Sequence, residues 1–233
     1  MSDEQTQGPT GSGFGTGALS KITAFIYWHL MVLVLMCVAS LPVVALFLLL
    51  ARAPGNLPLV PLILILYGPV LSAGLYAMRD RTRVEELAPA RSFVKGIRIG
   101  WLDALKAWAP PMVFEAVILA GLAISGDAVG GAIFGLLAMI GVIVLLWGLN
   151  ALVIATFFSF RWIDIARLAI YYLGRRWIGT LGLLALLVVA TALVLFASEG
   201  ALWLFGGVFV AFLWSIVQPT VADIQERFTT AAP

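Results

Sequence analysis

The chain has 233 residues, of which 62% are hydrophobic and 11% are charged, and its formal net charge is +2. Soluble domains carry about 25% charged residues, so this composition indicates a membrane protein with several spans. The single cysteine, Cys37, excludes an internal disulfide, and the single histidine, His29, argues against a His-based metal site. The HExxH, Walker A and GxSxG motifs are missing from the sequence, so we expect no enzyme activity, no cofactor and no metal.

The first 20 residues differ sharply from the rest of the chain. They are small and polar and include glycine at positions 8, 11, 13, 15 and 17. Such a segment cannot bury a core, so we expect a disordered tail over residues 1–20. The first apolar run is too long for the core of a signal peptide, and we expect it to be a retained span. We expect the membrane domain over residues 21–225 and a short tail over residues 226–233.

Six apolar runs have the length of a transmembrane helix. We expect spans at residues 22–50, 59–78, 107–125, 132–158, 177–197 and 201–221. Pro42 and Pro69 lie inside the first and second spans. A proline ring removes one ladder hydrogen bond and crowds the preceding turn, so we expect a kink at each. The predicted fold is therefore all-α, a polytopic membrane protein of six helices.

The most polar stretch of the body, residues 79–108, lies between the second and third spans. It carries seven basic and four acidic side chains. Apolar residues recur in its second half at the spacings of one helical face, at Val94, Ile97, Trp101, Leu105 and Trp108. Arg91, Lys95 and Arg98 recur in the same way on another face. We expect a cytoplasmic amphipathic helix that lies on the membrane surface with its basic side toward anionic headgroups.

The basic face has three possible uses, which the sequence leaves open. Arg91, Lys95 and Arg98, with Trp101 beside them, can set the topology, contact lipid or form a docking face for a partner protein. A second basic loop holds Arg161, Asp164, Arg167, Arg175 and Arg176.

The distribution of cationic side chains predicts the orientation. Six spans place both termini on one side of the membrane. If that side is the cytoplasm, all 14 Lys and Arg residues except Arg52 are cytoplasmic. Because cytoplasmic segments are enriched in Lys and Arg, we expect both termini in the cytoplasm.

Glu115 is the only acidic residue deep inside an expected span. Counted along antiparallel helices, Glu115 and Asn150 both lie roughly 12 Å from the cytoplasmic edge, a depth at which they could hydrogen-bond across the third and fourth spans. Two interpretations stay open. The pair is a site for a substrate or a proton, or it is a protonated acid that locks two helices together.

Several segments together carry a family resemblance. They are a Leu-Pro segment at residues 40–44, a Gly-Pro segment at 68–76, a Phe-plus-basic segment at 90–105, and residues 165–173 before Arg175. The pattern resembles the YesL-like family of bacterial membrane proteins, a domain of unknown function, over about residues 18–228. One departure is that residues 45–67 separate the first two segments, which are nearly adjacent in many members.

The resemblance implies a location and a set of partners. Members are bacterial cell-membrane proteins and are often associated with carbohydrate ABC importers. It therefore implies a non-catalytic accessory or assembly subunit in the lipid bilayer, docked on transporter permease subunits. A homo-oligomer stays open, and we expect no nucleic-acid partner. The alternative function is a small-solute transporter or channel that uses Glu115 and Asn150.

Overall fold

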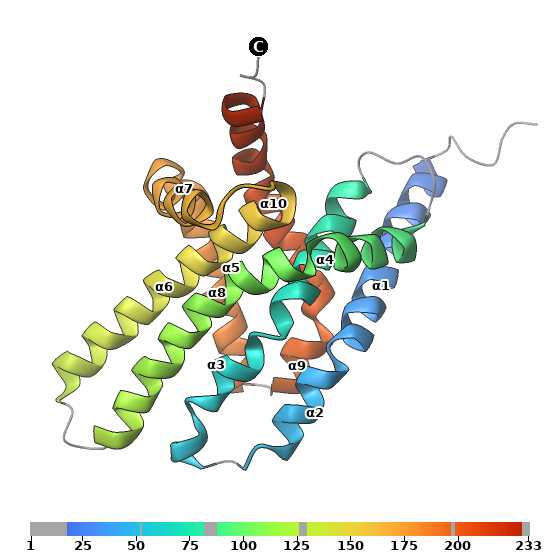
Figure 1. The fold of residues 1–233 in the computed structure, drawn as a ribbon. Coiled ribbons are helices and arrows are strands. Elements are labelled where there is room, and N and C mark those ends of the chain that lie inside the picture. Colours follow the sequence, from blue (N-terminus) through green and yellow to red (C-terminus); the bar gives the residue numbers. More distant parts are fainter. Residues whose placement is uncertain (1–17, 52, 82–87, 126–129, 197–198, 230–233) are drawn as a thin grey trace, which may run out of the picture.

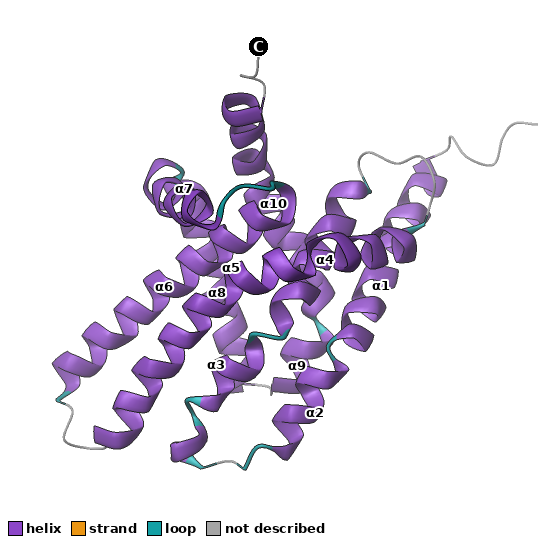
Figure 2. Ribbon diagram, viewed as in Figure 1, coloured by secondary structure: helices purple, strands orange, loops and turns teal. Residues whose placement is uncertain are grey.

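The computed structural model describes residues 18–51, 53–81, 88–125, 130–196 and 199–229. Within these ranges the regular structure is helical throughout, without a strand (Figure 2). Five helices are long and apolar enough to cross a membrane, and the number is six if the bent pair of residues 54–64 and 67–80 counts as one span. The structure confirms the predicted all-α, polytopic fold. We expected a disordered tail over residues 1–20, and residues 1–17 of it lie outside the described part of the chain.

The helices form one bundle with two distinct ends. They are α1 (Ala18–Ala39), α2 (Leu41–Leu49), α3 (Leu59–Leu64), α4 (Tyr67–Asp80), α5 (Pro89–Ser125), α6 (Gly131–Phe157), α7 (Trp162–Arg175), α8 (Trp177–Phe196), α9 (Glu199–Leu204) and α10 (Gly206–Ile224). Figure 1 shows the start of α1, the end of α4, α7 and the end of α10 toward one end, here called the α7 end. Helices α2, α3 and α9 lie toward the other end. A π-helical turn, Gln225–Thr229, directly follows α10, so the expected tail over residues 226–233 begins as helix.

The first span is a broken helix rather than a kinked one. Helix α1 ends before Ser40, and Pro42 lies in the first turn of α2, where a missing N–H costs least. The indole of Trp203 in α9 donates to the Ser40 Oγ at 2.7 Å and to the Cys37 carbonyl at 3.2 Å. A side chain from another span therefore supplies the donor at the break.

The second span is broken in the same manner. Helices α3 and α4 meet at an angle of 41°, two residues before Gly68 and Pro69. The Trp108 indole of α5 donates to the Leu64 carbonyl at 3.0 Å. A Cβ at Gly68 would lie 2.8 Å from the Trp108 ring, so only glycine lets the indole reach the break.

Helix α5 corrects the prediction of a separate surface helix. The expected surface helix and the third span form one continuous helix of 37 residues. Pro110 and Pro111 lie in its interior and not in a first turn. They leave the carbonyls of Lys106 and Ala107 without the usual ladder donors, which bends a helix. Figure 1 shows α5 changing direction along its length, with its second part running beside α6.

The predicted apolar stripe of α5 is also partly wrong. Val94 and Trp101 are exposed, while the buried face consists of Phe93, Gly96, Ala104, Ala107 and Trp108. Gly96 lies against α4, where a Cβ would be 2.9 Å from the Tyr76 Cβ. Close backbone approach at a small residue, and not hydrophobicity alone, selects the face that is buried.

The second basic loop is in fact an amphipathic helix, α7. Ile165, Ala169 and Tyr172 are buried at spacings of four and three and pack in one cluster with Ala151 and Ile154 of α6. The spacing of these residues predicts a helix, and the high charge of the segment hid it. Helix α7 holds the α6 end against the end of α10.

We predict that Gly207→Ala destabilises the protein. The new Cβ would lie 2.5 Å from the Leu33 Cα, so the backbones of α1 and α10 would have to separate. Overpacking of this kind costs ~1–3 kcal/mol. Gly135→Ala in α6 is the matched control, because its Cβ would meet no atom within 4 Å. Thermal unfolding in detergent measures both, and equal midpoints would contradict the prediction.

Candidate functional site

Glu115 lies in a recess between α5 and α6. A Cβ at Gly141 of α6 would be 3.0 Å from the Glu115 Oε2, so the glycine makes room for the carboxyl group. The Glu115 Oε1 is buried and finds no hydrogen-bond partner among the described residues.

Asn150 lies elsewhere along α6, and the predicted Glu115–Asn150 pair is wrong. The Asn150 Nδ2 donates to the Leu146 carbonyl of its own helix at 3.0 Å. Asn150 follows Gly141, the neighbour of Glu115, by nine residues. That separation is roughly 13 Å along the helix. The two polar groups do not form one site.

The register of α5 against α6 explains this error. Pro111 fits against Gly148, where a Cβ would lie 2.7 Å from the proline Cγ, and Glu115 fits against Gly141. The prediction aligned the two helices by their distance from an assumed membrane edge. The glycines instead fix an alignment about two and a half helical turns away.

The four residues of the predicted contact face do share one surface. Arg91, Lys95, Arg98 and Trp101 are all exposed, on the side of α5 opposite its contacts with α4. We call these four residues the α5 outer face. It carries three positive charges and an aromatic ring, a combination suited to anionic headgroups or an acidic protein surface.

A charged cluster that the sequence analysis missed lies where α7, α8 and α10 meet. Asp223 of α10 accepts hydrogen bonds from the Tyr172 hydroxyl at 2.8 Å and from the Arg227 Nε at 3.1 Å. Arg175 and Arg176 lie farther away, at 3.9 and 3.8 Å from the carboxylate oxygens. The spacing of Asp223 and Arg227 by four residues was the one local signal of this cluster.

Tyr172 is the buried member of the cluster, with 1% of its surface exposed. Burial, and then the hydrogen bond to Asp223, raises the pKa of Tyr172 to about 12. The phenol therefore stays protonated at neutral pH and acts as a donor to the carboxylate.

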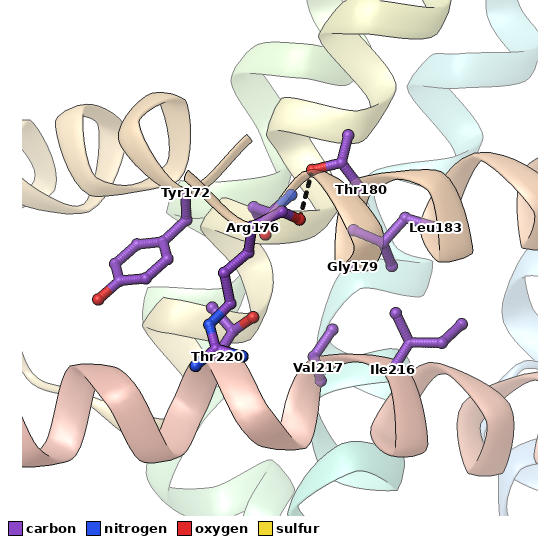
Figure 3. Close-up of a pocket in the computed structure, with 9 residues that line it drawn as sticks. Tyr172, Arg176, Gly179, Thr180, Leu183, Ile216, Val217 and Thr220 are labelled. Atoms are coloured by element: carbon purple, nitrogen blue, oxygen red, sulfur yellow. Dashed lines mark hydrogen bonds between the residues drawn. The ribbon is translucent and has the colours of Figure 1, made fainter. Parts of the chain in front are cut away.

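A small cavity lies beside the cluster (Figure 3). Its volume of about 10 Å³ is the space of one water molecule. Its lining comes from α6, α7, α8 and α10 and includes Asn150, Tyr172, Arg176, Thr180 and Thr220. Asn150 thus belongs to the α7–α8–α10 junction and not to the neighbourhood of Glu115.

No three side chains of His, Cys, Asp or Glu in the described part of the chain come together in a way that could hold an ion.

Comparison with known proteins adds no assignment. No protein-family model matches the chain, and no significant match is found among curated proteins or solved structures. The YesL-like resemblance therefore stays a prediction from the motifs. Two of those motifs lie at structural breaks, residues 40–44 between α1 and α2, and Gly68 with Pro69 at the start of α4.

We predict that Tyr172→Phe lowers the unfolding midpoint, because Asp223 loses a donor from a buried phenol. A loss of about 1 kcal/mol in the free energy of unfolding lowers the midpoint of a chain of this length by roughly 2–4 °C. Tyr171→Phe makes the same chemical change at an exposed neighbour and should have little effect.

The pH dependence of the same variant gives a second readout. The raised pKa of Tyr172 contributes stability below pH 10, the ordinary tyrosine value, and this contribution is lost as pH rises through about 12. The stability difference between wild type and Tyr172→Phe should therefore shrink above pH 10. A constant difference up to pH 12 would contradict the prediction.

We also predict that Glu115 and Asn150 are energetically independent. A double-mutant cycle with Glu115→Gln and Asn150→Leu should give a coupling below about 0.5 kcal/mol, as for residues without shared contacts. The measurement is equilibrium unfolding in mixed micelles. A coupling well above that value would restore the paired site.

Proposed function

We propose that this protein is an integral membrane accessory or assembly subunit, itself not catalytic, that docks on the permease subunits of a carbohydrate ABC importer. The observation that carries the proposal is the α5 outer face, an exposed basic surface on a helix that continues into the membrane domain. The importer as the partner is supported by the resemblance of the motifs to the YesL-like family.

The proposed orientation places the α7 end in the cytoplasm of a bacterial cell, with both termini on that side. The cationic side chains of the described residues support it, since they gather on elements toward that end: the end of α4, the first part of α5, α7, and the end of α10 (Figure 1). Cytoplasmic segments of membrane proteins are enriched in such residues. The α5 outer face would then be at the cytoplasmic surface, where a permease or its ATPase is accessible.

The arrangement of polar groups argues against transport by this chain alone. A transporter needs a polar path through the bundle, generally at broken helices. The indoles of Trp108 and Trp203 occupy the two breaks described above. The alternative, a transporter or channel, retains one supporting observation, the buried Glu115 Oε1 without a hydrogen-bond partner among the described residues.

We predict that neutralising the α5 outer face releases the partner. The triple variant Arg91→Gln, Lys95→Gln, Arg98→Gln should reduce the recovery of permease subunits by about fivefold or more when the tagged chain is purified from its native membrane. Arg161→Gln with Arg167→Gln, which removes exposed charges from α7, is the control and should keep full recovery. Equal recovery from all three proteins would contradict the docking proposal.

A flux measurement distinguishes the two candidate functions. Liposomes that contain only this protein should show no sugar uptake above the empty-liposome background. Uptake that Glu115→Gln abolishes would favour the transporter instead.

A further inference from the structure

An open groove of about 720 Å³ runs between α8 and α10 from the α7 end. Its walls come from the start of α8 and the second half of α10, which are both candidate membrane spans. The lining residues are Arg175, Arg176, Trp177, Ile178, Gly179, Gly182, Ser215, Ile216, Pro219, Thr220 and Asp223. The groove therefore has a charged head at the α7 end and a largely uncharged length along two spans.

The charged head keeps capacity for an anion. Three guanidinium groups surround the Asp223 carboxylate, and the two short hydrogen bonds to it come from Tyr172 and Arg227. Arg175 and Arg176 stand at 3.9 and 3.8 Å, beyond hydrogen-bond distance, and more than a third of each side chain is exposed. Asp223 orients these two residues without saturating their donors. Paired guanidinium groups match the geometry of a phosphate.

The floor of the groove is a close contact between α8 and α10. A Cβ at Gly182 of α8 would lie 3.1 Å from Ile216 of α10, so the glycine lets the two helices approach and leaves no side chain to fill the groove above the contact. Pro219 has no N–H, so the carbonyl of Ser215, which also lines the groove, lacks its ladder donor.

The surroundings of the groove are those of a membrane surface. Trp177 and Ile178, at its head, are 63% and 71% exposed. A tryptophan at the end of a span is typical of the headgroup level. Figure 3 shows the Arg176 side chain reaching from the α7–α8 junction toward Thr220 of α10. A free phosphate ion would use the arginines but leave the apolar length uncovered.

We propose that this groove binds one anionic phospholipid. The phosphodiester contacts Arg175 and Arg176, and an acyl chain lies over the contact of Gly179 and Gly182 with Ile216, along the outside of the α8–α10 pair. The site is separate from the α5 outer face and does not depend on the function proposed above.

The test uses the full chain in detergent and native mass spectrometry. Phosphatidylglycerol should bind in preference to phosphatidylcholine. The double variant Arg175→Gln, Arg176→Gln should weaken phosphatidylglycerol binding about 30-fold, because each cation near an anionic headgroup strengthens binding about fivefold. Arg161→Gln with Arg167→Gln removes the same charge from α7, outside the groove, and should bind as wild type.

A second variant tests the groove independently, in case the arginine variant does not fold. Ser215→Trp fills the groove at an exposed position without changing a charge, and it should also weaken phosphatidylglycerol binding. A photoactivatable phosphatidylglycerol should label residues 175–183 and 212–223. Four results would each overturn the proposal. They are equal binding of the two lipids, unchanged binding in both variants, photolabelling of residues outside these two ranges, and displacement of the lipid by millimolar inorganic phosphate. Recovery of the permease should stay unchanged in both groove variants, so this test and the docking test fail separately.

Discussion

Close packing of a neighbouring helix against glycine is the interaction on which the rest of this structure depends. Lipid gives apolar helices little reason to associate, so packing and hydrogen bonding must hold the bundle together. The α1 backbone at Leu33 packs against Gly207, Pro111 packs against Gly148, and Trp108 packs against Gly68. Each contact fixes a register as well as a distance. The position of Glu115, opposite Gly141, follows directly from the contact between Pro111 and Gly148 in the same helix pair.

The broken spans need hydrogen-bond donors for their free backbone carbonyls, and tryptophan side chains supply them. Backbone groups away from water need internal partners, and a helix break frees several of them. At Ser40 and at Leu64 the donor is an indole from a distant part of the chain, Trp203 or Trp108. An indole can bury a large ring and still reach a carbonyl with its N–H. The breaks are thus parts of the packed structure and not open polar sites, which is why they support an accessory role better than transport.

Hydropathy and charge predicted the helical fold, and they placed the ends of α6 and α8 to within a residue, because both reflect local composition. They predicted neither the register nor the continuity of α5. Glu115 and Asn150 have similar depths by counting, but the glycine contacts are pairwise and could not be read from either helix alone. The cluster around Asp223 was missed for the same reason, since Tyr172 and Asp223 are 51 residues apart. The α5 outer face was found because its members lie on one helix.

The two basic surfaces differ in what holds their cations. On the α5 outer face the cations project from an exposed helix surface, so their positions depend only on α5. At the head of the groove, Tyr172 holds the Asp223 carboxylate, and Arg175 and Arg176 lie 3.9 and 3.8 Å from it, so one carboxylate attracts both cations to the same place. Positioned guanidinium groups lose less freedom on binding than long exposed side chains do, so the groove is suited to one bound molecule. The outer face is suited to a broad, salt-sensitive contact with a protein or membrane surface. A lipid in the groove would also bridge α8 and α10 at the junction that anchors α7, and so connect lipid composition to the stability of this end of the bundle.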